Sequence, residues 1–330
     1  VGERRAAADA RHIAVEFLHP VTVGRRALPA LMGSAGAAAG DVVVGVAYDG
    51  SPLPDRVDVA LADRAVPSAV TSVPLASGEL DAAKESAVTA YHILWELTHV
   101  FLEQAGGSPS QPGVSAPTGS ADLAALYPML YQPARTGGAP SDQARAAATA
   151  SAREKLIESA EVRARCLEQH DDGLARAAEL VAAAPTVFTF GNGGSATDAA
   201  DLAWRLGARG RAVSDDIATV TAVANDVSFD VVFARQLATL GRPGDVAIGL
   251  STSGNSPNVL AGLAEAARRG VHTIGLAGYA GGAMASAELD LCLVVASSSV
   301  HRIQEAQVSL YNELARRADR GLRPPRPGPG

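Results

Sequence analysis

The sequence predicts an α/β protein whose second half builds a parallel sheet with helices on both faces. Short apolar, β-prone runs alternate there with helix-like stretches, as in βαβ units. The runs are apolar almost throughout, which is typical of parallel strands buried on both faces. Two of the runs end abruptly in loops of glycine or hydroxyl residues. The expected strands are Thr186–Phe190, Val246–Leu250, Val271–Leu276 and Leu289–Val295.

Helical periodicity and composition divide the chain. A chain of 330 residues is long for one core, so we expect two structural units. Helices are predicted at about 144–170 and 174–183. The expected organisation is an α/β region at 1–103, a Gly/Pro/Ser-rich linker at 104–143, an α/β domain at 144–320 and a disordered tail at 321–330.

Bulk composition excludes several classes of partner. The net charge is −7 and no basic stripe is present, so nucleic acid is not expected to bind directly. No apolar run reaches the roughly 18–20 residues that cross a bilayer, so no membrane association is expected. Cys166 and Cys292 are the only cysteines and form no CxxC pair, which favours the reducing cytoplasm and argues against a structural zinc site.

The first informative loop is Gly-Asn-Gly-Gly-Ser at 191–195, between an expected strand and a helix expected from about Thr197. Glycines allow a tight turn and a close approach of the backbone to a ligand. The free amides at the following helix start favour an anion. A plain strand-to-helix turn explains this loop equally well.

The second loop is Ser-Thr-Ser-Gly-Asn-Ser at 251–256, again after a strand. Ser256 suits an N-cap, Pro257 the first helical position and Gly270 the end of that helix. A cap needs one hydroxyl and the loop carries four. The surplus favours phosphate binding over a structural turn.

Both loops, the Asn225-Asp226 pair and the Arg302–Glu305 segment resemble the phosphoheptose isomerase branch of the sugar isomerase (SIS) family, over roughly 153–320. The resemblance implies a flavodoxin-like three-layer α/β/α SIS domain that assembles as a homodimer or homotetramer. It also implies a phosphosugar ligand such as sedoheptulose 7-phosphate. The residues that match its binding positions are Gly193, Gly194, Ser195, Asn225, Asp226, Ser251, Thr252, Ser253, Ser256 and Gln304.

The chain departs from the family where the chemistry is done. Aldose–ketose isomerisation needs a base and an acid, which the family supplies with a Glu and a His. Arg205 and Asn312 stand at those positions, and neither titrates near neutral pH. We therefore expect phosphosugar binding with weak or absent turnover.

Some members of the family also bind zinc. Their ligand positions are held here by Asp201, Arg205, Gln304 and Asn312, a poor zinc set, so no metal or other cofactor is expected. Asp201 and Arg205 are four residues apart, and we expect them to pair across one helical turn.

The N-terminal region carries a weaker echo of the same pattern. Residues 40–52 read GDVVVGVAYDGSP beside GDVAIGLSTSGNSP at 244–257, and residues 85–97 resemble the last helix of the isomerases. We interpret the first hundred residues as a reduced SIS half. His92 falls at the catalytic histidine position of that helix. It is expected to be a structural histidine, and the alternative is a catalytic His92 that completes a site together with Glu85.

Three functions follow as hypotheses. The first is a phosphosugar-binding SIS protein without turnover, as in members that bind the replication initiator. The second is an active isomerase with rearranged residues such as His92. The third is a non-enzymatic regulatory or accessory scaffold, of a kind associated with nickel–iron hydrogenase genes.

Overall fold

The chain divides into two compact units. In the computed structural model, Val1–Ala8 and Ser159–Gly330 form a C-terminal unit, and Asp9–Glu158 form an N-terminal unit. The structure describes residues 5–18, 30, 42–48, 53, 56–62, 66, 69, 71–76, 79–104 and 141–322. Nearly all of the expected linker at 104–143 lies outside the described residues, as does most of the expected tail. The unit boundary runs through helix α1 (Arg5–Leu18), whose first turn belongs to the C-terminal unit.

A five-stranded parallel sheet of order β5-β4-β6-β7-β8 is the centre of the C-terminal unit. Its strands are β4 (Val187–Phe190), β5 (Gly210–Ala212), β6 (Val246–Ser251), β7 (His272–Gly278) and β8 (Leu291–Val295). The four strands expected from the sequence are confirmed, with ends that differ by at most two residues. The short edge strand β5 was not predicted.

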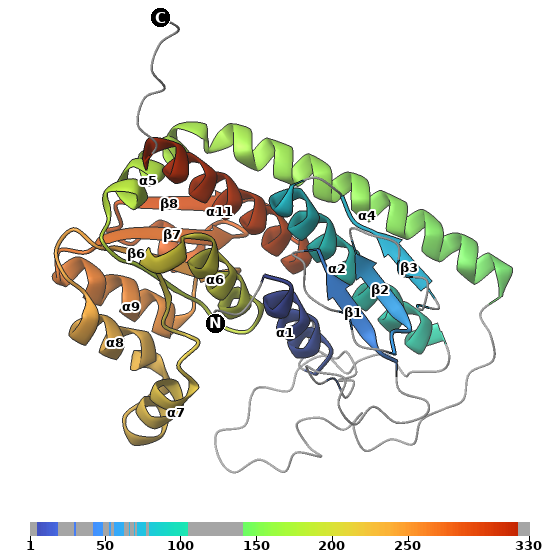
Figure 1. The fold of residues 1–330 in the computed structure, drawn as a ribbon, viewed down its shortest axis with the longest axis horizontal. Helices are drawn as coiled ribbons and strands as arrows, with labels where there is room; N and C mark the ends of the chain where they lie inside the picture. The colour runs from blue at the N-terminus through green and yellow to red at the C-terminus, as the bar shows by residue number, and fades with distance from the viewer. Residues whose placement is uncertain are drawn as a thin grey trace, which may run out of the picture. The chain divides into compact units, whose positions relative to one another are not determined.

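Helices cover both faces of this sheet, which makes the three-layer α/β/α arrangement (Figure 1). Helices α5, α6 and α11 pack together on one face, and α8 and α9 pack on the other. Helix α4 (Asp142–Gln169) begins in the N-terminal unit and ends in the C-terminal unit. The other helices and 3-10 turns of the C-terminal unit are α5 (Asp171–Ala183), α6 (Gly194–Arg205), η2 (Gly207–Arg209), α7 (Ile217–Asp226), η3 (Phe229–Val231), α8 (Val232–Leu240), α9 (Pro257–Arg268), α10 (Gly282–Ala285) and α11 (Val300–Leu322).

Strand β4 shows how the layers are joined. Phe188 and Phe190 join the apolar cluster that α8 and α9 complete, whereas Thr189 donates its hydroxyl to the backbone oxygen of Ala199 on α6 at 2.7 Å. This follows from the two-residue period of a strand, which sends alternate side chains to opposite faces. A Cβ on Gly262 of α9 would lie 2.9 Å from the Phe190 ring, so glycine permits the close packing of helix on sheet.

The N-terminal unit contains a smaller parallel sheet of order β1-β2-β3 and a long helix α2 (Leu80–Gln104). The strands are β1 (Val44–Ala47), β2 (Val59–Ala62) and β3 (Thr71–Pro74). Strand β1 lies inside the GDVVVGVAYDGSP segment, while the expected turn after it lies mostly outside the described residues. The buried Asp9 carboxylate is an ion-pair partner of Lys84 and accepts a bond from the Tyr48 hydroxyl.

None of the helices in the described ranges has the length and apolar content needed to span a bilayer. This agrees with the absence of a long apolar run in the sequence.

Candidate functional site

The glycine loop, residues 191–195, turns the chain from β4 directly into α6. Gly193 has φ +54° and is the N-cap residue of the helix, which begins at Gly194. A Cβ on Gly191 would lie 2.7 Å from the backbone oxygen of Ser195. The helix therefore begins three residues before the predicted Thr197, because the glycines let the backbone fold back without a side-chain cap. Gly194 and Ser195 are consequently helical and buried.

The hydroxyl loop, residues 251–256, brings three serine side chains close together. Ser251 Oγ lies 3.0 Å from Ser256 Oγ and 3.4 Å from Ser253 Oγ, and it accepts the backbone N–H of Gly254 at 3.1 Å. The predicted positions of Ser256 as N-cap and Pro257 as first helical residue are confirmed, but the Ser256 side chain makes no capping bond to the helix. The first amides of α9 thus remain available for an anion.

The hydroxyl loop is held in place by the loop after β7. Gly254 has φ +65°, and a Cβ there would lie 2.0 Å from the backbone oxygen of Gly281. Its own oxygen accepts the Met284 amide at 2.9 Å, and Asn255 Oδ1 accepts the Ala283 amide at 2.8 Å. These contacts fix the position of the hydroxyl loop against the start of α10.

The two loops lie together, as the adjacent strands β4 and β6 require. Asn192 and Asn258 exchange side-chain amide bonds of 2.8 and 2.9 Å. Asn258 is buried in the first turn of α9, and Asn192 lies in the glycine loop. The structure therefore brings Gly193, Gly194 and Ser195 beside Ser251, Thr252, Ser253 and Ser256.

Gln304 lies on α11 close to this edge of the sheet. A Cβ on Gly278, at the end of β7, would meet both the backbone oxygen of Thr252 and the side chain of the adjacent Ile303, each at 2.5 Å. Gln304 is buried, and its Oε1 has no hydrogen-bond partner among the described residues.

Asn225 and Asp226 are at the C-terminal end of α7, where both are exposed. They bond to each other, from Asn225 Nδ2 to Asp226 Oδ1 at 2.8 Å. The structure gives no bond between this pair and the two loops. Their expected binding role stays a prediction.

His92 belongs to the N-terminal unit. It is buried on α2, with ring centroids 5.5 Å from His12 and 4.8 Å from Tyr91. Glu85 on the same helix accepts the Thr89 hydroxyl on its backbone oxygen at 3.1 Å. These surroundings favour the structural interpretation of His92.

The two positions at which the family places its catalytic Glu and His are engaged in other contacts. Arg205 Nη1 bonds Asp319 Oδ2 on α11 at 2.8 Å. Asn312 Oδ1 accepts Arg5 Nη2, also at 2.8 Å. Each side chain thus has a partner far away in the sequence.

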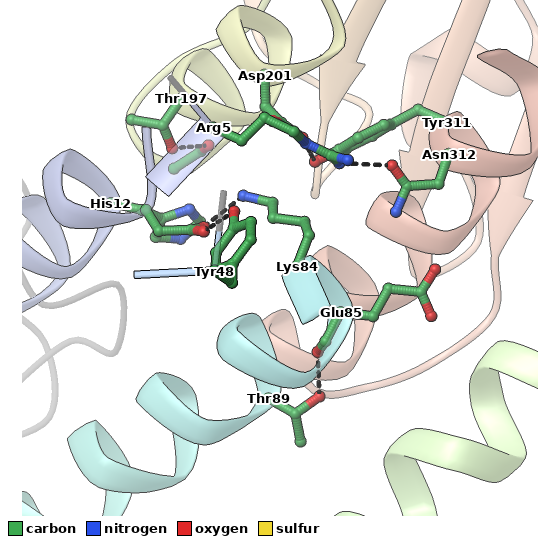
Figure 2. Close-up of polar contacts among 12 residues, drawn as sticks. Arg5, His12, Tyr48, Lys84, Glu85, Thr89, Thr197, Asp201, Tyr311 and Asn312 are labelled. Carbon is green, nitrogen blue, oxygen red and sulfur yellow. Dashed lines mark hydrogen bonds and ion pairs between the residues drawn. The ribbon is translucent and has the colours of Figure 1, made fainter. Parts of the chain in front are cut away.

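Asp201 is at the centre of a buried network that includes Arg5 (Figure 2). Arg5 Nε reaches Oδ1 at 2.7 Å, Arg5 Nη2 reaches Oδ2 at 3.0 Å, and the Tyr311 hydroxyl donates to Oδ2 at 2.7 Å. Burial and the charges of Asp201 and Asp198 raise the pKa of Tyr311 well above its ordinary value, so its hydroxyl remains a donor. The expected Asp201–Arg205 pair stays a prediction, since the bonds described here join Asp201 to Arg5 and Tyr311 and Arg205 to Asp319.

These contacts also test the zinc position that the family resemblance implies. Both oxygens of Asp201 and the amide oxygen of Asn312 bind a guanidinium, and Arg205 is itself a cation. In the part of the chain that the structure describes, no group of three or more His, Cys, Asp or Glu side chains is arranged to hold a metal. The residues do not fit zinc.

Sequence reasoning missed Arg5, Tyr311 and Asp319. Arg5 is nearly two hundred residues from Asp201, and no local pattern signals such a contact. Tyr311 and Asn312 are adjacent on α11. Two polar groups within an otherwise apolar stretch of that helix were the one signal in the sequence for a buried polar contact.

The fold and the loops define a class: a parallel α/β domain with a pre-formed hydroxyl loop suited to an anionic ligand. The SIS domain model matches residues 156–278. A phosphoheptose isomerase of Paramagnetospirillum magneticum is 45% identical over 145 residues, which cover 41% of this chain and 75% of that protein. One from Campylobacter concisus is 41% identical over 146 residues, covering 42% and 77%.

Solved structures agree with this assignment. A phosphoheptose isomerase from Francisella tularensis is 28% identical with a TM-score of 0.50, over 52% of this chain and 98% of that one. The C-terminal domain of glucosamine-fructose-6-phosphate aminotransferase from the same organism has a TM-score of 0.56 over 96% of this chain and 81% of its own. At 11% identity this second likeness shows fold alone. The chain belongs to the phosphoheptose isomerase-like branch of the SIS family.

Proposed function

We propose that the C-terminal unit binds a phosphosugar such as sedoheptulose 7-phosphate and does not interconvert aldose and ketose. The phosphate group is assigned to the hydroxyl loop, where Ser251, Ser253 and Ser256 converge beside the uncapped start of α9. Hydroxyls and helix-start amides are the donors that phosphate oxygens accept. The relatives named phosphoheptose isomerase support this ligand class.

The proposal that the protein does not interconvert aldose and ketose rests on the contacts of Arg205 and Asn312. Moving a carbon-bound proton through an enediol needs a group that accepts it near neutral pH. An arginine bonded to Asp319 and an asparagine bonded to Arg5 offer no such group. General acid–base catalysis contributes about 10²–10⁴-fold per group, so the loss of both removes most of the rate.

We further propose that the protein acts in the cytoplasm as a homo-oligomer, without nucleic acid as a partner. The exposed apolar side chains of α7 and η3 support the oligomer. The ring contacts of His92 make the rearranged isomerase the weaker alternative. A scaffold without a small ligand is the remaining alternative.

Titration calorimetry with sedoheptulose 7-phosphate and a panel of phosphosugars tests the ligand. Ser253→Ala and Ser256→Ala are each expected to weaken binding about 10-fold or more, since a hydrogen bond to a charged group contributes about 1.5–3 kcal/mol. Ser286→Ala is the matched control, because its exposed hydroxyl follows α10 and donates to the backbone oxygen of Ala283. If no phosphosugar binds, or if the loop variants bind like the control, the ligand assignment is wrong.

A further inference from the structure

Arg5 is a buried cation to which the proposed function gives no role in holding the phosphosugar. Its side chain is fully buried, as is that of Asp201. Two nitrogens hold both carboxylate oxygens, and one of them also holds Asn312 Oδ1. A buried ion pair is tolerated only when such bonds satisfy the charges.

The acceptors of this guanidinium come from two separate helices. Asp201 lies on α6 and Asn312 on α11, and the Tyr311 hydroxyl fixes the carboxylate from a further side. Figure 2 shows Arg5 directed toward both acceptors. A carboxylate and an amide oxygen that face each other in a buried space form a donor set for a cation. Here the first turn of α1 supplies that cation from the same unit.

We propose that Arg5 is a resident cation which takes the place of a divalent metal between α6 and α11, and which holds Asp201 and Asn312 in position. The guanidinium satisfies three oxygen atoms with directional bonds that a lysine ammonium cannot reproduce. The site consequently needs no zinc, and the N-terminal turn is an integral part of the C-terminal unit.

The first test is metal content and metal response of the full chain. Protein dialysed against EDTA is expected to keep its melting temperature, and added Zn²⁺ or Mn²⁺ is expected to leave it unchanged. Stoichiometric zinc in the purified protein that disappears in Asp201→Asn would overturn the proposal.

The second test is chemical rescue of Arg5→Ala. This variant leaves a cavity shaped for a guanidinium, and its melting temperature is expected to fall by on the order of 10 °C. Millimolar guanidinium or methylguanidinium should restore part of that loss, while equal ammonium or sodium chloride should not. Arg211→Ala, at an exposed arginine of β5, is the control and should show neither the loss nor the rescue.

If Arg5→Ala does not fold, the double variant Arg5→Met/Asp201→Asn is compared with its two single variants instead. The double variant removes both charges, so it is expected to melt above either single variant. Equal rescue by all salts, or additive losses in the double variant, would contradict the proposal. Because no sugar is present in these measurements, their failure is distinct from failure of the phosphosugar assignment.

Discussion

Arg205 and Asn312 stand where the phosphoheptose isomerases place their catalytic Glu and His. Both positions lie on helices of the C-terminal unit, and both side chains make ordinary structural contacts, with Asp319 and Arg5. The Arg205–Asp319 bond joins α6 to α11, and the Asn312–Arg5 bond joins α11 to the first turn of α1. The chemistry of proton transfer is absent because neither side chain exchanges a proton near neutral pH.

Asp290 predicts a pH dependence of stability. Burial opposes its ionisation, but bonds from the Thr273 amide, His272 and the Thr273 hydroxyl outweigh burial and lower the pKa of Asp290. A lowered folded-state pKa gives stability that is full above the unfolded-state value near 3.8 and is lost as pH falls through the folded-state value. Asp290→Asn should therefore flatten the acid limb of the stability curve.

Urea unfolding from neutral pH down to about pH 3 measures this slope. Glu288→Gln removes an exposed carboxyl two residues away and is expected to keep the slope of the wild type. An unchanged slope in Asp290→Asn would show that other carboxyl groups dominate acid unfolding.

At the residue scale, the sequence predicted the side chains of the hydroxyl loop but not the distant residues that bond to α6. The serines of 251–256 are consecutive along the chain, so a local motif sufficed to group them. Arg5, Tyr311 and Asp319 meet α6 through tertiary packing alone. The i,i+4 spacing of Asp201 and Arg205 predicts a pair across one turn of α6, but spacing alone does not signal the distant partners of Asp201 and of Arg205.

At the element scale, strands with continuous apolar runs were predictable. Strands β4, β6, β7 and β8 lie between helices on both faces, and their sequences are accordingly apolar for most of their length. Strand β5 has only three residues, at the edge of the sheet, and its central Arg211 is exposed. It is defined by its pairing with β4 and carries no apolar signal of its own.

The hydroxyl loop predicts different effects for two glycines. Gly254→Ala should abolish phosphosugar binding, because its Cβ would press to 2.0 Å from the Gly281 oxygen at a positive φ. Gly193→Ala also has a positive φ, but nothing lies within 4 Å of the added Cβ. It should cost about 1 kcal/mol of stability from strain alone.

Calorimetry measures phosphosugar binding and urea unfolding measures stability, so the two variants separate the steric clash at Gly254 from the backbone strain at Gly193. Equal effects of the two substitutions on binding would mean that the contact between the Gly254 and Gly281 loops does not shape the site.

Helix α7 predicts an interface between copies of the chain. Ile217, Val227 and Phe229 at α7 and η3 are 68%, 71% and 51% exposed, and α7 has no buried residue. Large apolar side chains exposed to water favour association. Val227→Glu together with Phe229→Glu should shift the protein to a smaller species in sedimentation equilibrium.

Thr239→Glu adds the same carboxylate to an exposed position of α8 and should leave the mass unchanged. A wild-type protein that sediments as a monomer would rule out this interface.

On the scale of the whole molecule, we propose that the N-terminal unit is a reduced SIS half. Its three-stranded parallel sheet and long α2 helix follow the order of an α/β unit, and β1 lies in the segment that echoes residues 244–257. The fold likeness to the aminotransferase domain extends over 96% of the chain, and so over both units. The sequence predicted an α/β region here because the echo preserved the strand.

The central claim is that this SIS protein holds a phosphosugar without isomerising it. Enediol formation exchanges a carbon-bound proton of the sugar, so NMR of sedoheptulose 7-phosphate in D₂O reports the step directly. The Paramagnetospirillum magneticum phosphoheptose isomerase serves as the positive control. With saturating protein we predict neither deuterium at carbon nor aldose product, although the sugar binds. Deuterium uptake and product formation that His92→Ala abolishes would contradict the claim and establish the rearranged isomerase.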